Sequence, residues 1–458
     1  MKGALKGITA IVCAALTAMS FAACQQDALT PYETAVKNGF VGTEVEWLAS
    51  LHGADGKDGA DMDVEALYQA AKDNGYEGEF LDFLKEFNVQ VNEDNDVATI
   101  AKNAMSVVSI YCGFSQTTQT GGFWNGTKSE TTYYAAAGAG VIIDLNKQAG
   151  NAWIVTNYHV IYDANSDSDG ISDCIYLYTY GALNKFNAEK GDVNGDGMKA
   201  TYVGGAMDYD IALLKVEGKV DELATAEEAK LADSDEVSVG EKVFAIGNPD
   251  GAGIAVTSGV VSVESEYIEM TSTDGAKRSV DYRVMRTDAA INHGNSGGAL
   301  FNAAGELIGI TNAKNVDNEV DNMGYALPIT PVKYLCQNIV DNNGVVKRAM
   351  LGIKVTTVAS SAAIGLDGKI KIVEEFAVAD AVGVGEAAYR KLSAGDVLLG
   401  MQINNGAQIT FKRQYQLSDM LLTVRKGDRV TLKIRNQDGV ETSVVIDFDK
   451  DEYFTTYA

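Results

Sequence analysis

The sequence is short of the residues that build metal sites, disulfide frameworks and nucleic-acid surfaces. It has 3 histidines and 5 cysteines among 458 residues, and no cysteine stands in a CxxC pair or in a Cys/His spacing typical of zinc. The net charge of -26 excludes partners that reward Lys and Arg, such as nucleic acid and anionic membrane surfaces. We therefore expect no metal, no organic cofactor and no nucleic-acid partner.

Long apolar runs are also scarce, because only one is present and it lies at the start of the chain. Lys2 and Lys6 precede an apolar run over 8–23, which is typical of an export signal. Two alanines then precede Cys24, which resembles a bacterial lipobox. We expect 1–24 to be a lipoprotein signal with Cys24 lipidated, and the protein to be anchored on the extracytoplasmic face of the cell membrane. An ordinary cleaved secretory signal is the alternative.

Three cysteines would remain in the mature chain, Cys112, Cys174 and Cys336. We expect three buried thiols, and a bridge between Cys112 and Cys174 in an oxidising setting is the alternative. Asp192, Asn194 and Asp196 followed by a glycine match the first half of a calcium loop, but position 203 is Val rather than the bidentate Glu. Solvated hairpin tips explain this cluster and the one over 163–170 without calcium.

Residues 25–96 form an acidic prefix with 17 acidic and 4 basic side chains, which indicates a solvated attachment rather than part of a main core. A weak repeat relates 35–51 to 71–87, and each copy reads as a helix, an Asn-Gly stop and a second helix. The glycine-rich stretch GADGKDG between the copies indicates a flexible linker. We expect a helical spacer or small interaction module.

From residue 97 onward the pattern changes to short apolar runs separated by Gly, Asn and Asp, which predicts a mainly β fold. A barrel or sandwich is expected over 97–335, followed by an amphipathic helix whose end and linker occupy 336–349. A smaller α+β unit is expected over 350–450, with a tail over 451–458. Its predicted strands lie near 351–357, 370–374, 397–402, 429–435 and 442–447, and its helix near 414–424.

The stretch INHGNSGGAL places Ser296 in a glycine-rich turn. A serine hydroxyl needs a general base to act as a nucleophile, and that base is usually an oriented imidazole. Of the three histidines, His52 lies in the acidic prefix and His293 is only three residues from the serine. His159 ends the apolar run AWIVTNYHV, so it is the candidate base.

The imidazole in turn needs a buried carboxylate to orient it. Asp210 heads the apolar run DIALLKV, an expensive place for a charge unless the charge is used; Asp208 is the competitor, farther from that run. The order His159, Asp210, Ser296 on a β-rich chain is the chymotrypsin arrangement, whereas subtilisin and α/β-hydrolases have other orders and alternating βα units.

The geometry of the backbone then explains the glycines around Ser296. Backbone N–H groups of Gly294 and Ser296, on either side of Asn295, must point at one developing oxyanion, which demands a turn that side chains would obstruct. Gly297 and Gly298 let the chain pass close behind the nucleophile. The segment 294–296 is therefore the predicted oxyanion hole.

The motifs TNYHV, DIALLKV and TDAAINHGNSGGAL, together with FAIGNP, GYALPI and MLGI, closely resemble those of HtrA-type, DegP-like serine proteases over about residues 100–448. The resemblance implies a trypsin-like double β-barrel followed by a PDZ domain. It also implies ATP-independent cleavage of unfolded or misfolded proteins in extracytoplasmic quality control, capture of C-terminal peptide tails by the PDZ domain, and a homotrimer or higher homo-oligomer. One departure is His293, which replaces a proline often found before GNSGG.

The resemblance also carries over the binding sites. The base of the primary substrate pocket lies six residues before the serine, at an uncharged alanine, so small apolar side chains are the expected P1 residues. The pocket residues are Ala290, Ile291, Ile310, Thr311 and Asn312, and the loop for the peptide carboxylate is Leu351, Gly352 and Ile353. A non-catalytic chaperone or PDZ scaffold at the cell surface is the alternative function, and an esterase using the same serine is a second one.

Overall fold

The computed structural model describes Lys72 and residues 96–457, apart from 121–127, 169, 185, 188–191, 194–196, 274–278, 313–322 and 366–367. The chain divides into two units, Met1–Asn95 and Asp96–Ala458. The predicted signal, the lipidated Cys24 and the helical repeats of the prefix lie outside the described residues, except that Lys72 is helical and exposed. No described helix is both long and apolar enough to cross a membrane.

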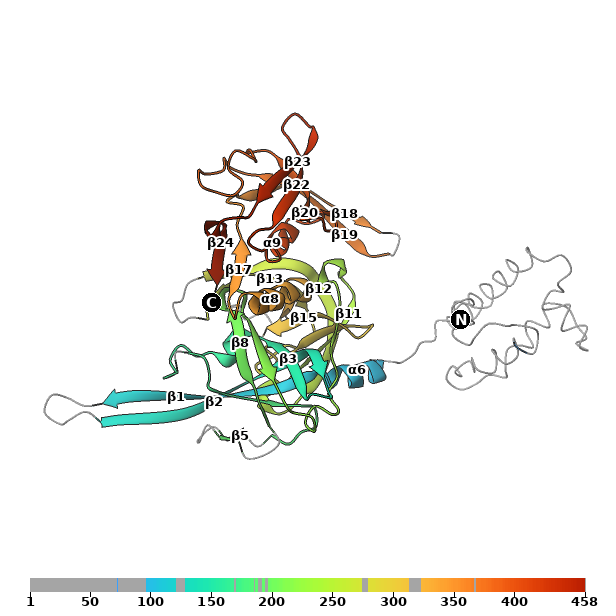
Figure 1. Ribbon diagram of the computed structural model, residues 1–458. Coiled ribbons are helices and arrows are strands. Elements are labelled where there is room, and N and C mark those ends of the chain that lie inside the picture. The colour runs from blue at the N-terminus through green and yellow to red at the C-terminus, as the bar shows by residue number, and fades with distance from the viewer. Residues whose placement is uncertain are drawn as a thin grey trace, which may run out of the picture. The chain divides into compact units, whose positions relative to one another are not determined.

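Strands dominate the second unit, so the prediction of a mainly β chain is confirmed (Figure 1). The α-helices are few and short. Those in the described residues are α6 (Asp96–Ala104), α7 (Tyr158–Ile161), α8 (Ile329–Asp341) and α9 (Tyr415–Leu421). The same part of the chain also contains the 3-10 turns η2 (Met207–Tyr209), η3 (Ser234–Glu236), η4 (Pro249–Gly251) and η5 (Asp451–Tyr453).

The first sheet orders its strands β7-β4-β1-β2-β3-β9-β8. Their bounds are β1 (Val107–Thr120), β2 (Lys128–Asn146), β3 (Asn151–Thr156), β4 (Cys174–Tyr178), β7 (Met198–Lys199), β8 (Thr201–Ala206) and β9 (Ile211–Val216). The paired strands β1 and β2 run on as a long hairpin, drawn in cyan in Figure 1. A separate short pair is formed by β5 (Phe186–Asn187) and β6 (Asp192–Val193). Strand β9, with the sequence IALLKV, is buried at all but one position, as expected of a strand covered on both faces.

The second sheet orders its strands β10-β15-β14-β11-β12-β13-β16, and β15 also pairs with β16. This extra pairing closes six of the strands into a barrel. The bounds are β10 (Lys230–Leu231), β11 (Lys242–Gly247), β12 (Ala255–Thr271), β13 (Ser279–Thr287), β14 (Ala299–Asn302), β15 (Glu306–Asn312) and β16 (Gly324–Pro328).

One apolar core joins the two sheets and helix α8. It contains Val155 and Leu213 from the first sheet, Phe301 and Leu327 from the second, and Leu335 from α8. Because these side chains interdigitate, the strand ends that meet beside this core are held in fixed positions relative to one another. The candidate site lies at those strand ends.

The C-terminal module has its own sheet, with the order β18-β19-β20-β22-β23 and β21 paired with β20. The bounds are β18 (Val355–Ile364), β19 (Ile370–Val378), β20 (Val397–Ile403), β21 (Ile409–Thr410), β22 (Arg429–Arg435) and β23 (Glu441–Asp447). The predicted strand near 351–357 begins later, at Val355. Two further strands, β17 (Val346–Ala349) and β24 (Phe454–Tyr457), pair with each other, and β24 lies in the segment predicted as a tail.

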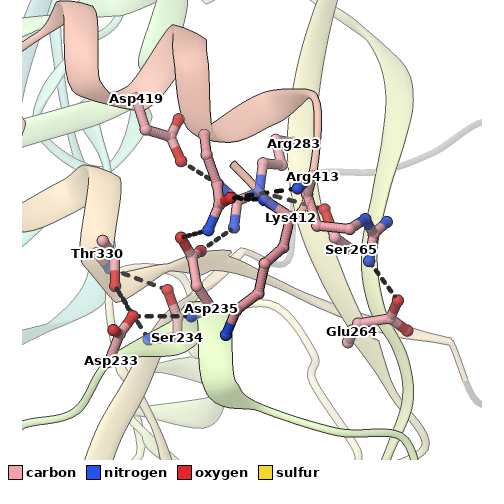
Figure 2. A network of polar contacts seen from close by, with 11 residues as sticks. Asp233, Ser234, Asp235, Glu264, Ser265, Arg283, Thr330, Lys412, Arg413 and Asp419 are labelled. Atoms are coloured by element: carbon pink, nitrogen blue, oxygen red, sulfur yellow. Dashed lines mark hydrogen bonds and ion pairs between the residues drawn. The ribbon is translucent and has the colours of Figure 1, made fainter. Parts of the chain in front are cut away.

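Buried charges join the barrel to this module (Figure 2). Arg283 of β13 pairs with Asp235 of η3 at 3.0 Å and with Asp419 of α9, and its side chain is only 8% exposed. Its guanidinium carbon lies 3.4 Å from the centre of the Tyr415 ring. A second ion pair, Arg413 with Glu264, spans the same contact at 2.8 Å. These interactions fix α9 against the barrel.

Candidate active site

Two neighbouring strands of the first sheet bring His159 and Asp210 together. Strand β3 pairs with β9 up to Thr156↔Ala212, so the residues that follow β3 and precede β9 are adjacent. The single turn of α7 then carries His159, and the backbone N–H of Tyr158 donates to the carbonyl of Asp210 at 3.1 Å.

His159 makes two hydrogen bonds to one carboxylate, one from its imidazole and one from its backbone. Its Nδ1 lies 2.7 Å from Oδ2 of Asp210, and its backbone N–H donates to Oδ1 at 2.9 Å. An ionised carboxylate can only accept hydrogen bonds, so Nδ1 carries the proton and Nε2 is left as the basic nitrogen. Asp210, and not its competitor Asp208, makes these contacts.

The Asp210 side chain is completely buried, and its charge is met by a third donor. The side-chain amide of Asn312 donates to Oδ2 at 2.9 Å. Burying an isolated carboxylate costs several kcal/mol, roughly, unless hydrogen bonds compensate it. Asn312, predicted to line the substrate pocket, therefore supports the carboxylate of Asp210.

Ser296 lies in the turn before β14, and this turn contacts the first sheet. It is 5% exposed, and its carbonyl accepts from the backbone N–H of Ala139 at 2.8 Å. Gly138 marks how closely the two halves approach, because a Cβ there would lie 2.5 Å from Val160 of α7 and 3.2 Å from the Ser296 carbonyl. The serine turn and the histidine helix thus rest against the same point of β2.

Two glycines in this turn adopt backbone conformations that other residues avoid. Gly294 has φ 88° and Gly297 has φ 81°. A Cβ on Gly294 would meet the carbonyl oxygen of Asn248 at 2.1 Å, and one on Gly297 would meet that of Ala139 at 2.2 Å. Both positions therefore require glycine.

The orientation of the 293–294 peptide bears on the predicted oxyanion hole. The carbonyl of His293 accepts from the backbone N–H of Asp250 at 2.9 Å. The described peptide bonds are all trans, so C=O and N–H of one peptide point in opposite directions. The Gly294 N–H therefore points away from Asp250. The neighbouring Asn295 is buried, and its Oδ1 has no hydrogen-bond partner among the described residues.

Asn157 ties the two halves of the site together, and the sequence reasoning missed it. Its side chain donates to the carbonyl of Asp210 at 2.9 Å and accepts from the backbone N–H of Gly297 at 2.7 Å. It is fully buried. A polar residue between an apolar strand and His159, in the motif TNYHV, was the available signal.

The predicted pocket residues lie in two places. Ala290 is exposed, and its carbonyl accepts from the hydroxyl of Thr257 at 2.9 Å, while Ile291 is half-buried. Ile310 and Thr311 are fully buried in β15, and the hydroxyl of Thr311 donates to the carbonyl of Asn295 at 2.6 Å. Ala290 and Ile291 therefore keep exposed surface beside the serine turn, whereas Ile310 and Thr311 do not.

The predicted carboxylate loop precedes β18, which lies at one edge of the module's sheet. Leu351 is buried, and Ile353 packs against the module's core. Gly352 has φ 71°, and a Cβ there would meet Oε2 of Glu386 at 2.1 Å, so a carboxylate already lies against this loop. On this edge strand, the hydroxyl of Thr357 donates to Oε1 of Gln414 at 2.7 Å.

The remaining cysteine and acidic signals form no cofactor site in the described part of the chain. Cys112, Cys174 and Cys336 are not joined in a disulfide. Asp163 accepts from the backbone of Asn165 and from the hydroxyl of Tyr134, so its oxygens are already engaged. Among the described residues, no three His, Cys, Asp or Glu side chains form a group that could hold a metal.

Comparison with known proteins points to one family. Residues 138–310 match the trypsin-like peptidase domain. The chain is 33% identical to the serine protease Do-like HtrA of Lactococcus lactis subsp. cremoris (strain MG1363) over 59% of this chain and 63% of that protein. It is also 33% identical to the periplasmic serine endoprotease DegP of Escherichia coli (strain K12), over 69% of this chain and 58% of that protein. The chain thus matches less than two thirds of the length of these relatives.

Among solved structures, one is described as the HtrA-type protease AlgW with tripeptide. It is 22% identical, covers 79% of this chain and 97% of that chain, and superposes with a TM-score of 0.46.

Proposed function

Because the chain carries a trypsin-like peptidase domain and is homologous to the HtrA and DegP serine proteases, we propose that it is an exported serine endopeptidase acting on unfolded or misfolded proteins. Residues 97–335 are the protease domain in this proposal, and 350–450 are a PDZ domain. The observation that carries it is the 2.7 Å contact between His159 and a fully buried Asp210, beside the glycine turn of Ser296.

The groups at the site fit acyl transfer. Ser296 Oγ attacks the peptide carbonyl, and Nε2 of His159 takes the hydroxyl proton. Asp210 holds the imidazole and stabilises the imidazolium that forms. N–H groups of Gly294 and Ser296 receive the oxyanion, with Asn295 buried between them. His159 then protonates the leaving amine, and water hydrolyses the acyl-enzyme by the same proton route.

Substrate selection follows from the surface beside the serine turn. Ala290 offers no charge to a Lys or Arg side chain, so small apolar P1 residues are preferred. Ile291 lines the same pocket, with the strand Ile310–Asn312 behind it. Mass spectrometry of cleavage products from an unfolded protein reports the preference directly, and cleavage mainly after Lys or Arg would contradict it.

The C-terminal module binds peptide tails in this proposal. An extended peptide would add to the edge of β18, and the loop Leu351–Ile353 would receive its carboxylate. The carboxylate of Glu386 beside Gly352 must then move aside or be compensated. The chain assembles as a homotrimer or larger homo-oligomer and is held at the extracytoplasmic face of the membrane by lipid on Cys24.

Digestion of casein tests the proposal, with the wild-type chain compared with Ser296→Ala. The wild type should degrade casein and the variant should not, since the hydroxyl that attacks the peptide is gone. Thermal unfolding of both proteins serves as the control that the variant is folded. Equal degradation by the two proteins would overturn the proposal, and no degradation by a folded wild type would favour the non-catalytic scaffold.

A further inference from the structure

The catalytic carboxylate stands in a tight hairpin turn. Strands β8 and β9 pair up to Ala206↔Ile211, and the four residues between them are the turn η2 followed by Asp210. Asp210 is in the left-handed region at φ 51°, and its N–H donates to the carbonyl of Met207 at 3.1 Å. Such a conformation costs a non-glycine residue roughly 1 kcal/mol or more and persists only where surrounding contacts hold it.

The segment that follows α8 packs directly on this hairpin. The backbone N–H of Gly205 donates to the carbonyl of Gly344 at 3.2 Å, and Gly205 and Val345 form a parallel bridge. A Cβ on Gly204 would lie only 2.1 Å from the Gly344 carbonyl oxygen. The segment continues as β17, which pairs with β24 from Val346↔Tyr457 to Ala349↔Phe454 (Figure 1). The strand β24 is therefore connected through β17 to the β8–β9 hairpin that carries Asp210.

Tyr457 of this last strand contacts the residue next to Asp210. Its ring centre lies 5.3 Å from that of Tyr209, and the planes meet edge to face at 78°. Such an aromatic pair contributes roughly 0.5–1.5 kcal/mol beyond the area it buries. Burial raises the pKa of Tyr209 to about 12, and the positive charge of Arg348 opposes this shift. Tyr209 is therefore a neutral phenol at neutral pH.

Arg348 of β17 connects this aromatic pair to the C-terminal module. It lines one cavity together with Tyr209 and Tyr457, and the two phenol groups raise the pKa of its guanidinium against the effect of burial. Its Nη2 also donates to the hydroxyl of Ser418 on α9 at 2.8 Å. Three segments that are far apart in sequence, the Asp210 turn, the last strand and α9, thus meet at one side chain.

A cavity of about 390 Å³ adjoins the same side chains. Tyr209, Arg348 and Tyr457 line it, with Asp419 and Leu422 of the C-terminal module on another wall. Open space on one side means that close packing does not by itself fix the Tyr209 ring. Removal of the Tyr457 ring would enlarge the space into which Tyr209 can relax, and Tyr209 is itself the last residue of η2, directly before Asp210.

We propose that Tyr209 is a positioning residue for Asp210, and that Tyr457 and Arg348 hold it in place. The inference rests on the proposed protease activity. The C-terminal strand thereby sets how well the carboxylate is aligned with His159, although it touches neither the substrate nor a reacting atom. Shifts of about 1 Å at a catalytic group can cost roughly 100-fold in rate, so a small movement of this turn is sufficient for a measurable effect.

The test compares full-length wild type with Tyr457→Ala, Tyr457→Phe and Thr456→Ala. Thr456 is exposed on the same strand and serves as the matched control. In hydrolysis of a fluorogenic peptide, Tyr457→Ala should lower kcat about 10- to 100-fold with little change in KM. Tyr457→Phe keeps the ring edge against Tyr209 and should restore kcat to within about threefold of wild type, since ring packing supplies most of the contact. Thr456→Ala should match wild type.

The proton NMR signal of the His159 Nδ1–H gives a readout that does not depend on activity. Tyr457→Ala should shift or broaden this signal, and Tyr457→Phe and Thr456→Ala should preserve it. A wild-type signal and a wild-type kcat in a folded Tyr457→Ala would overturn the positioning role. If the wild type itself hydrolyses no peptide, the proposed protease function fails, while the NMR comparison still decides whether Tyr457 positions the carboxylate.

Discussion

At the scale of single residues, the site depends on polar groups placed where apolar side chains would be expected. Asp210 is completely buried, and its carboxylate is met by His159 and Asn312. Asn157 satisfies the carbonyl of Asp210 and also fixes the backbone at Gly297. Each of these contacts removes an unpaired buried group whose cost would be about 1–3 kcal/mol. The polar groups around Asp210 are therefore held in place by hydrogen bonds to one another.

Substitution of Gly297 by alanine separates backbone strain from steric conflict. Gly297 and Gly218 both have positive φ, 81° and 69°, so alanine strains the backbone similarly at each. A Cβ at Gly297 would lie 2.2 Å from the carbonyl oxygen of Ala139, whereas none would meet an atom within 4 Å at Gly218. In urea unfolding, we expect Gly218→Ala to lose about 1 kcal/mol and Gly297→Ala clearly more. Equal losses would contradict the close packing of the serine turn on β2.

The sequence alone selected His159 and Asp210 as candidates for the base and its carboxylate, and the structure places them in contact, but their supporting amides were not predicted. Elimination among the three histidines left His159. The apolar run after Asp210 indicated a carboxylate that must be paired or used. The partners of Asp210 are different, because Asn157 and Asn312 lie 53 and 102 residues away from it. No local pattern distinguishes a buried supporting amide from one in a turn or a pocket wall. Asn312 was accordingly placed in the substrate pocket.

At the scale of secondary-structure elements, long apolar strands were predictable and short paired strands were not. The sequences of β9 and β11 are almost wholly apolar, so the burial of these strands follows from composition. Strands β17 and β24 have four residues each. They are stable only when paired with each other beside the β8–β9 hairpin that carries Asp210. The segment after residue 450 therefore reads as a tail, because nothing in its own sequence shows what it pairs with.

Helix α9 carries a carboxylate that should make stability depend on pH. Burial raises the pKa of Asp419 to about 6, against the opposing charge of Arg283, with Asp235 raising it and Arg348 lowering it further. Between about pH 4 and pH 6 the folded protein holds a proton that the unfolded chain has released. The contribution of Asp419 to stability therefore falls as pH rises through this window.

Thermal unfolding between pH 4 and pH 7 checks this sign with Asp419→Asn. The variant cannot bind the proton, so its stability relative to wild type should improve as pH rises from 4 to 6. Asp438→Asn, a substitution at an exposed turn, is the matched control and should run parallel to wild type throughout. A constant difference between Asp419→Asn and wild type over the whole range would show that Asp419 keeps its ordinary acidity.

At the scale of the whole described unit, the reaction groups come from separate parts that a shared core holds together. His159 and Asp210 lie beside the ends of β3 and β9 of the first sheet, and Ser296 lies in the turn before β14 of the second. The core under them includes α8 and also Leu422 of the C-terminal module. The module is therefore packed against the catalytic unit through apolar contacts as well as through the charges around Arg283.

Covalent labelling with a fluorophosphonate is the most direct test of the central claim, that Ser296 is a nucleophile activated by His159. The full-length wild type should be labelled at Ser296, as located by peptide mass spectrometry. His159→Ala should be labelled about 100- to 10,000-fold more slowly, which is the usual contribution of a general base. Labelling of His159→Ala at the wild-type rate, or labelling of the wild type at another residue, would contradict the account.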